Sequence, residues 1–315
     1  MDTVLLIIII AVCILILACV AIVAVIFRMS IVRPKKPADT ASEIPQLKAF
    51  SEELAAGRNW FLTQNPETLT MQSYDGLKLY AYYLPHENAR GTLVLMHGFH
   101  SSNLNDFSCV FRYLYELGFN LLAPDQRSMN RSEGKYITFG VRERFDCRDW
   151  IEFINSRPEV ACRPIILDGI SMGCATVLMA LGLRLPENVA GAIADCGYTT
   201  PKAIFTHVLK HHYHLPAFPF IPMSAVVTKL IAGFGIDECS TLDAMRKNRL
   251  PVLFVHGTAD ELVPSYMSVQ NYEACVSEKT LFLAEGAAHG MSYLIKREEC
   301  EKLLEDFLDR HAPAN

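Results

Sequence analysis

The motif Gly-x-Ser-x-Gly at residues 169–173 carries the strongest chemical signal in the sequence. It follows an apolar run, Pro164–Leu167, that predicts a strand, and a helical stretch begins at Met172. A serine hydroxyl is a weak nucleophile unless a sharp turn exposes it and a neighbouring base removes its proton. Flanking glycines let the backbone pass close to other elements without a Cβ clash. The motif therefore predicts a nucleophilic Ser171, with an ordinary glycine turn as the alternative.

Two residues further along the chain could supply the acid and the base. Asp260 follows a predicted strand, Val252–Val255, and His289 follows the next one, Thr280–Leu283. A carboxylate just past the carboxyl end of a strand is well placed to hold an imidazole, and the order serine, acid, histidine is the expected one. Singly, Asp260 could be a helix N-cap and His289 a loop histidine, and Asp195, which also ends a strand, is a rival acid.

The chemistry expected of this triad is acyl transfer in two steps. His289 takes the proton of Ser171 as the oxygen attacks a carbonyl, and Asp260 fixes the imidazole tautomer. The resulting oxyanion needs preorganised donors. We expect the backbone N–H groups of Met172, directly after the nucleophile, and of Phe99, in the loop after a predicted strand, to form this oxyanion hole.

The predicted secondary-structure elements that must position these residues indicate an α/β protein. Short apolar runs alternate with helical stretches, which predicts a mainly parallel sheet with helices on both faces. The segment at about residues 199–248 is rich in aromatics, histidine and proline, and it predicts a small lid inserted over the strand ends. The strands are expected at Leu69–Ser73, Lys78–Leu84, Thr92–Met96, Asn120–Ala123, Pro164–Leu167, Gly191–Ala194, Val252–Val255 and Thr280–Leu283, and the helices near Gln46–Gly57, Asp106–Leu117, Gly140–Asn155, Met172–Leu183 and Lys296–Arg310.

These motifs together resemble the α/β-hydrolase superfamily, over roughly Leu69 to Arg310. Within it, the chain looks most like small membrane-anchored bacterial serine hydrolases of the prolyl-oligopeptidase-like or serine-aminopeptidase-like kind. The resemblance implies the fold and the triad strongly and the substrate weakly. It departs from the family at residues 128–132, which read Ser-Met-Asn-Arg-Ser where many relatives have Gly-His-Gly before a serine. The motif residues are His97-Gly98, Asp125-Gln126-Arg127, residues 169–173, His256-Gly257 with Asp260, and Ala288-His289-Gly290, of which Asp125 and Arg127 are expected to pair structurally near the active-site floor.

The N-terminal segment reads as a membrane anchor. Val4–Phe27 is an apolar run without charge, glycine or proline, and as a helix it reaches roughly 36 Å, enough to cross a hydrocarbon core of about 30 Å. The flank before the run lacks basic residues, which argues against a cleaved signal peptide. The basic cluster follows the run, so the large domain is expected on the cytoplasmic side of a single-pass membrane protein, with that cluster near anionic head groups. Its members are Arg28, Arg33, Lys35 and Lys36.

The chain therefore divides into an anchor (1–33), a linker with a juxtamembrane helix (34–68) and a catalytic domain (69–315). No cofactor is implied, because no phosphate-binding glycine loop is present. A net charge of −5 without a concentrated basic surface argues against nucleic acid, and the 10 cysteines lack a disulfide or zinc spacing.

Cys174 is expected to be a packing residue. A metal at the lid histidines is a minor alternative, and the lid aromatics are expected to line an acyl pocket, to face the bilayer or to pack as core. The lid histidines are His207, His211, His212 and His214. The aromatic residues, together with the aliphatic Leu209, are Phe205, Tyr213, Phe218 and Phe220.

The function favoured by the sequence is hydrolysis of carboxylic esters or thioesters with an apolar acyl group, at or near the lipid bilayer. One alternative is a serine peptidase of the aminopeptidase kind, which would need an acidic patch for a substrate amine. Asp237, Glu238 or Glu261 could supply that patch. The other alternative is a membrane-tethered binding module without catalysis, which the complete triad disfavours. The sequence leaves the oligomeric state open.

Overall fold

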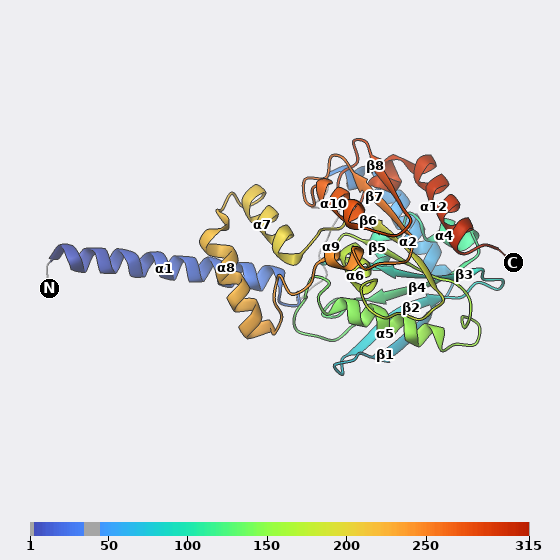
Figure 1. Cartoon of the computed structure of the whole chain (residues 1–315), viewed down its shortest axis with the longest axis horizontal. Helices are drawn as coiled ribbons and strands as arrows, with labels where there is room; N and C mark the ends of the chain where they lie inside the picture. Colours follow the sequence, from blue (N-terminus) through green and yellow to red (C-terminus); the bar gives the residue numbers. More distant parts are fainter. Residues whose placement is uncertain (1–2, 35–44, 315) are drawn as a thin grey trace.

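Eight short segments of the chain pair into one sheet (Figure 1). The computed structural model describes residues 3–34 and 45–314. The spatial order is β1-β2-β4-β3-β5-β6-β7-β8, with β1 and β2 antiparallel at one edge and the remaining strands parallel. The strands are β1 (Glu67–Gln72), β2 (Lys78–Leu84), β3 (Gly91–Met96), β4 (Phe119–Asp125), β5 (Ile165–Ile170), β6 (Val189–Asp195), β7 (Val252–Gly257) and β8 (Lys279–Ala284).

Helices cover both faces of this sheet, and the alternation of side chains explains why both faces can be apolar. In β3, Leu93 and Leu95 enter one core, whereas Val94 and Met96 enter the other. One face carries α5 (Glu143–Asn155), α6 (Met172–Ala180), α9 (Thr241–Met245) and α10 (Tyr266–Ala274), and the other carries α2 (Ser51–Thr63), α4 (Phe111–Glu116) and α12 (Arg297–His311). The predicted fold class and all eight predicted strands are thereby confirmed.

Some predicted helix bounds are wrong. The helix expected at Asp106–Leu117 is split into α3 (Asn103–Asp106) and α4, because the Ser108 hydroxyl donates to the Asn105 carbonyl oxygen and so competes with the helical ladder. α6 ends at Ala180, three residues before the predicted end.

The segment before β1 also differs from the prediction. The helix expected at Gln46–Gly57 is a 3₁₀ turn, η2 (Pro45–Phe50), followed directly by α2, which continues to Thr63. The predicted linker from Pro34 to Ile44 lies outside the described residues from position 35 onward.

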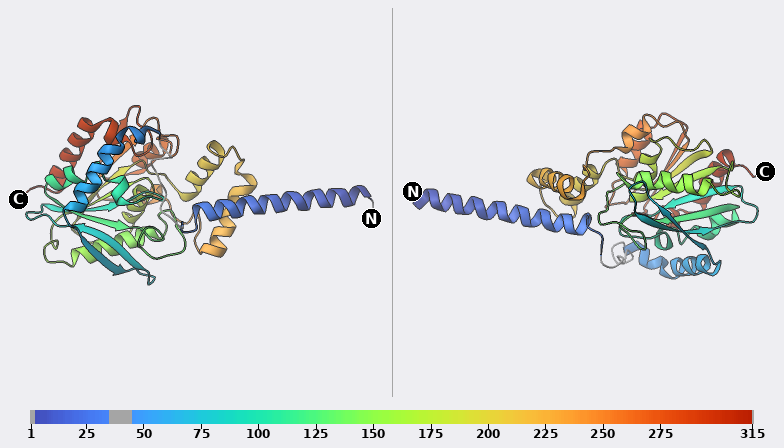
Figure 2. Two further views of the ribbon diagram at one scale, coloured as in Figure 1. Left: turned by 180° about the vertical axis from the view of Figure 1, so that it is seen from behind. Right: turned by 90° about the horizontal axis from the view of Figure 1, so that it is seen from below.

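The segment between β6 and β7 contains the expected lid. α7 (Pro201–His211), α8 (Ala217–Val227) and the π-helical turn η3 (Thr228–Ala232) stand away from the sheet, at the base of the long N-terminal helix (Figures 1 and 2). α9, in contrast, packs into the core beneath the sheet through Ala244 and Met245. The part of the insertion that can act as a lid is therefore α7 through η3.

The N-terminal helix α1 (Thr3–Ser30) is docked at its carboxyl end on the domain that contains the sheet. Ile31 is 1% exposed, and its carbonyl oxygen accepts a hydrogen bond from the Ile137 N–H. The Arg33 guanidinium donates to the carbonyl oxygens of Asn130 and Ser132, at 2.7 and 2.6 Å. We expected Arg33 to lie near lipid head groups. Instead, its guanidinium is held by hydrogen bonds within the protein.

Candidate active site

Three side chains converge at the carboxyl end of the parallel strands. Ser171 directly follows β5, Asp260 lies three residues after β7, and His289 lies five residues after β8. The Ser171 Oγ is 2.8 Å from His289 Nε2, and His289 Nδ1 is 2.7 Å from Asp260 Oδ2. Because the Asp260 carboxylate can only accept, Nδ1 carries the imidazole proton, and Nε2 is free to accept the serine proton. This tautomer is the one that a general base requires.

The backbone at Ser171 is held in an unusual conformation. Its φ of 58° and ψ of −116° place a non-glycine residue in a strained region, between the end of β5 and the start of α6. A Cβ at Gly173 would lie 1.8 Å from the Met96 carbonyl oxygen, so only glycine fits beside the nucleophile. The turn leaves Ser171 partly exposed at the N-terminus of α6, whose dipole favours negative charge nearby.

The Asp260 carboxylate is buried and fully hydrogen-bonded. Its Oδ1 accepts from the N–H groups of Leu262 and Val263, and its Oδ2 accepts from His289 and from His256, at 2.7 and 3.0 Å. Burial alone would raise the pKa of Asp260, but the two histidines outweigh it and lower that pKa strongly. Asp260 therefore stays ionised while it orients His289.

His256 has a role that sequence reasoning missed. Its Nε2 contacts two acceptors, Asp260 Oδ2 at 3.0 Å and the Val263 carbonyl oxygen at 2.8 Å, so it carries the proton there. Its Nδ1 then accepts from the Ser268 hydroxyl at 2.6 Å. The buried imidazole thus fixes the loop that holds Asp260. The signal was available, because His256 begins the motif that predicts Asp260, but nothing in the sequence shows that the two side chains bond.

The loop after β3 lies against the nucleophile, where we predicted an oxyanion hole. A Cβ at Gly98 would come 3.3 Å from Ser171 Cβ, and Asp106 accepts hydrogen bonds from the Gly98 N–H at 2.6 Å and from the Ser101 hydroxyl at 2.5 Å. Phe99, in this loop, packs against the apolar cluster that contains Met172, at the start of α6, and the oxyanion-hole role of their N–H groups stays a prediction. Asp106 was not predicted, because its five-residue spacing from Ser101 has no characteristic pattern.

A second network ties this loop to the end of β4. The Gln126 N–H donates to His97 Nε2 at 3.1 Å, so the His97 Nδ1–H donates to the Gly98 carbonyl oxygen at 2.8 Å. The side chain of Gln126 also donates to the His97 carbonyl oxygen. His97 and Gln126 are buried, and they hold the backbone of residues 97–98 in place from below. The side chains of His97 and Gln126 therefore stabilise the site through this loop and form no hydrogen bond to the triad residues.

Comparison with known proteins gives three concordant similarities. A family model described as serine aminopeptidase, S33, matches residues 87–231. The uncharacterized protein YqkD of Bacillus subtilis is 29% identical over 235 residues, covering 74% of this chain and 76% of YqkD. The Pyrococcus furiosus esterase Pf2001 superposes with a TM-score of 0.64 at 21% identity, covering 79% of this chain and 95% of the esterase.

The chain has the α/β-hydrolase fold. The Pyrococcus horikoshii acylaminoacyl peptidase shares the fold as well, with a TM-score of 0.57 at 19% identity, covering 79% of this chain and 42% of that one. Esterase and peptidase thus both occur among its structural neighbours, and identities this low establish the fold alone. The match of residues 87–231 to the serine aminopeptidase model favours hydrolase activity.

Opposing effects set the pKa of His289, the candidate base. Burial alone would lower the pKa of His289, but the charge of Asp260, with smaller contributions from Asp195 and Asp106, raises it above the ordinary value of 6.5. Asp195, the rival acid, makes no hydrogen bond to His289. Its pKa is raised to about 6 by burial, and its carboxylate accepts a hydrogen bond from the Ser292 hydroxyl at 3.5 Å.

Two buried acidic residues beside the site were also missed. Asp106 and Asp168 line a cavity of about 60 Å³ together with Asp195, and burial raises the pKa of both. They come from α3 and from β5, so only the fold brings them together. Of these two, Asp106 contributes to the raised pKa of His289.

Asp125 and Arg127 do not pair with one another as part of an active-site floor. Buried Arg127 instead forms ion pairs with Asp146 at 2.5 Å and with Asp75 at 2.9 Å, whereas Asp125 pairs with Arg131 at 2.7 Å. β4 ends at Asp125, so the two side chains leave the strand in different directions and find partners on different elements. Both act structurally, by linking β4 to α5 and to neighbouring turns.

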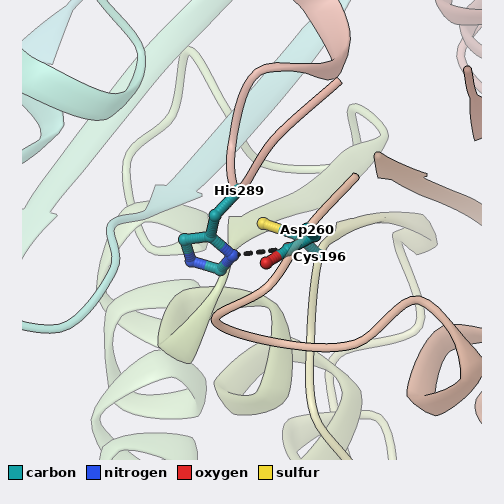
Figure 3. A group of neighbouring side chains, drawn as sticks. All are labelled: Cys196, Asp260 and His289. Atoms are coloured by element: carbon teal, nitrogen blue, oxygen red, sulfur yellow. Dashed lines mark hydrogen bonds and ion pairs between the residues drawn. The ribbon is translucent and has the colours of Figure 1, made fainter. Parts of the chain in front are cut away.

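Cys196 lies beside Asp260 and His289 (Figure 3). Within the described residues this is the only group of three metal-ligand types with close spacing, its ligand atoms lying within 4.8 Å of one another. Burial and the nearby carboxylates raise the pKa of the Cys196 thiol far above its usual range, so it stays protonated. Asp260 and His289 are already bonded to each other. We therefore interpret Cys196, like buried Cys174, as packing.

The lid histidines do not point at the triad. His207 and His211 stack with ring centroids 4.4 Å apart, and the Nε2 atoms of His207 and His212 contact the Glu261 carbonyl oxygen, at 3.0 and 3.2 Å. These contacts fasten α7 to the loop that carries Asp260. The metal alternative therefore lacks a converging ligand set among these three residues.

The lid aromatics divide into two groups. Phe205 packs edge-to-face on Phe139 at 4.6 Å, and Phe139 packs on Phe99 at 5.0 Å, so an aromatic path leads from the lid to the site. Tyr213 and Phe218 instead are 55% and 78% exposed. Leu209 and Phe220, 4% and 6% exposed, pack as core, which confirms that alternative for these two residues.

Replacing Asp260 with asparagine tests the assignment of the acid. The base works as neutral imidazole, so kcat should fall in the wild type as pH drops through a value above 6.5. D260N removes the largest opposing charge, so the acid limb of the pH–rate profile should shift to lower pH, and kcat should drop about 10⁴-fold because the tautomer is lost. Steady-state kinetics on a chromogenic ester would measure both. D195N is the control and should cost far less; the reverse order would show that Asp195 is the acid.

Proposed function

We propose that this protein is a membrane-anchored serine hydrolase that cleaves carboxylic esters or thioesters through an acyl-enzyme on Ser171. The observation that carries the proposal is the hydrogen-bond chain from Ser171 Oγ through His289 to the buried Asp260 carboxylate. Serine reacts as a nucleophile only with a base in this position. Structural hydrogen bonds alone do not require the strained backbone that exposes Ser171.

The proposed reaction has two matched halves. Ser171 Oγ attacks the substrate carbonyl carbon while its proton moves to His289 Nε2, and Asp260 stabilises the imidazolium. The oxyanion accepts hydrogen bonds from the N–H groups of Phe99 and Met172. His289 then protonates the leaving group as its bond to the carbonyl carbon breaks. In the second half His289 takes a proton from water while the water oxygen attacks the acyl carbon, and it returns that proton to Ser171 Oγ as the bond between Oγ and the acyl carbon breaks.

A serine-directed probe would test the nucleophile. A fluorophosphonate should label the wild-type protein covalently, and labelling should be lost in both S171A and H289A, because each removes one partner of the activated pair. S156A is the matched control, since Ser156 is an exposed serine at the end of α5 whose hydroxyl bonds only to the Phe153 carbonyl oxygen. In-gel fluorescence after membrane isolation would measure labelling.

Two results would contradict the proposal. An unlabelled but folded wild-type protein would favour the non-catalytic binding module. Equal labelling of the wild type and S171A would place the reactive serine elsewhere in the chain.

A peptidase is the second candidate, favoured by the description of the matching family model. A substrate amine would need unpaired carboxylates near the site, but two of the three acidic residues considered are already used within the lid. Asp237 pairs with Lys202 at 3.8 Å, and Glu238 pairs with Lys229 at 3.2 Å. Glu261 alone lies beside Asp260, exposed. One carboxylate makes a poor amine site, so we rank the esterase first.

Substrate comparison would separate the two candidates. We expect nitrophenyl acyl esters to be turned over at least tenfold faster, as kcat/KM, than aminoacyl arylamides with the same leaving-group reporter. The ester rate should rise with acyl length, because the lid supplies aromatic surface that a longer chain can bury. E261Q should leave the ester rate unchanged; a large loss on arylamides alone would instead favour the peptidase.

The membrane location is part of this proposal. Within the described residues, α1 is the one helix long and apolar enough to cross a membrane, although a signal sequence passes the same test. Only 6% of its most apolar window is buried in the protein, which argues against a core helix. Arg28 follows the apolar run, so the catalytic domain is proposed to face the cytoplasm.

Labelling at Cys162 would test this orientation. Cys162 is an exposed cysteine of the catalytic domain, in the turn before β5. A membrane-impermeant maleimide should label it in opened cells and not in intact ones, with C162S as the control for reaction at other cysteines. Labelling in intact cells would place the domain outside.

A further inference from the structure

One face of the lid is apolar where it should meet water. Phe218, Pro222, Val226 and Leu230 recur at every fourth position along α8 and η3, and all four are exposed. Phe218 is 78%, Val226 58% and Leu230 79% exposed. A helix that lies on a soluble domain presents polar side chains to solvent, whereas a contiguous apolar face marks an interaction site.

The lid segment also lacks the charges that keep a surface helix solvated. Residues 217–232 contain a single charged side chain, Lys229, and its ammonium pairs with Glu238 at 3.2 Å. The neighbouring Ile231 is 55% exposed. The exposed face thus has the composition of a surface that contacts lipid or protein.

The other face of the same helix packs on α1. Phe220 and Ile221 of α8 are each 6% exposed and belong to one apolar cluster with Val23 of α1. Figures 1 and 2 show α8 crossing α1 at the base of its projecting length. Cys19, Ile22, Ile26 and Phe27 of α1 pack against this cluster.

The position along α1 fixes the depth of the lid. The cluster contacts residues 19–27, which span roughly the last 12 Å of the apolar run at about 1.5 Å per residue. A hydrocarbon core of about 30 Å that begins near Val4 ends about 20 residues later. If α1 crosses a bilayer, α8 therefore lies where the hydrocarbon meets the head groups.

We propose that α8 and η3 are embedded in the same leaflet that α1 leaves, with the exposed apolar face in contact with lipid acyl chains. The inference rests on the proposed membrane anchoring of α1 and extends it to the lid. Continuity with α1 selects the bilayer as the occupant, because the contacts between α8 and α1 place any partner on this face within the membrane interface.

The docking of α1 keeps the lid at this depth. Backbone hydrogen bonds join Ile31 to Ile137 and Arg33 to Lys135, and the Arg33 guanidinium holds the adjacent loop. α1 therefore cannot tilt freely relative to the catalytic domain, and the two membrane elements reach the bilayer as one body.

This arrangement also indicates how substrate arrives. The apolar cluster that contains Val23 and Phe220 also contains Met172, the residue after the nucleophile, with Phe99 packed against it. The apolar packing is therefore continuous from α8 to the residue beside Ser171. The substrate class that fits is a membrane-partitioned amphiphile with a long acyl chain, cleaved at the ester or thioester near its head group.

Tryptophan quenching in vesicles would test the depth of the lid. Full-length V226W, reconstituted in phosphatidylcholine vesicles with brominated acyl chains, should lose at least twice as large a fraction of its added fluorescence as V276W. Val276 is the matched control, a valine 57% exposed in the turn before β8, at the end of the sheet away from the site. Trp60 and Trp150 of the parent protein set the baseline. I10W, in the middle of α1, reports on the anchor itself.

The outcomes separate the two inferences. Quenching of I10W and V226W, but not of V276W, supports the embedded lid. Quenching of I10W alone overturns the lid inference and leaves the anchor intact. No quenching of I10W overturns the anchoring of α1, and the lid inference with it.

A kinetic arm tests the route of the substrate. V226E/L230E should lower the ratio of long-chain vesicle-bound to short-chain soluble ester turnover about tenfold, because the lid no longer seats in the leaflet. V276E should leave that ratio unchanged. An unchanged ratio in the double variant would show that substrate does not enter along α8, and vesicle quenching would still report the depth of the lid if the protein proved inactive.

Discussion

The Asp260 carboxylate is the constraint on which the rest of the site depends. A buried carboxylate is costly unless every lone pair is used, and here two backbone N–H groups and two imidazoles saturate it. Those partners come from the loop after β7, from β7 itself and from the loop after β8. The hydrogen bonds to the Asp260 carboxylate therefore fix the position of both loops and the tautomer of His289. In that tautomer His289 Nε2 can accept the proton of Ser171.

The second organising contact joins α1 to the catalytic domain. A single-pass anchor on a flexible tether would leave the domain free to turn, but here Ile31 is buried and Arg33 is hydrogen-bonded to the loop after β4. The same loop begins with the Gln126 that holds His97 beneath the site. The orientation of the active site relative to α1 is therefore set by short-range contacts within the protein.

Sequence reasoning was most successful where a residue's role follows from local geometry. The Gly-x-Ser-x-Gly turn, the eight strands and the apolar N-terminal helix each depend on patterns within a few residues, and each lies where it was predicted. It was least successful for partners. Arg127 binds Asp75 and Asp146 from different elements, and the carboxylates of Asp106 and Asp168 meet only because the fold brings their segments to one cavity. Ion pairs and contacts between residues far apart in the chain produce no periodic pattern in the sequence.

The sequence by itself predicted the α/β-hydrolase fold and three side chains that could perform acyl transfer, in the order serine, acid, histidine, because backbone turns and apolar periodicity are local properties. The tertiary structure decided which groups meet: that His289 binds Asp260 and not Asp195, that His256 shares the same carboxylate, and that the lid packs on the apolar end of α1. These choices depend on packing and on desolvation of charge, which act between segments far apart in the chain and therefore exist only in the folded protein.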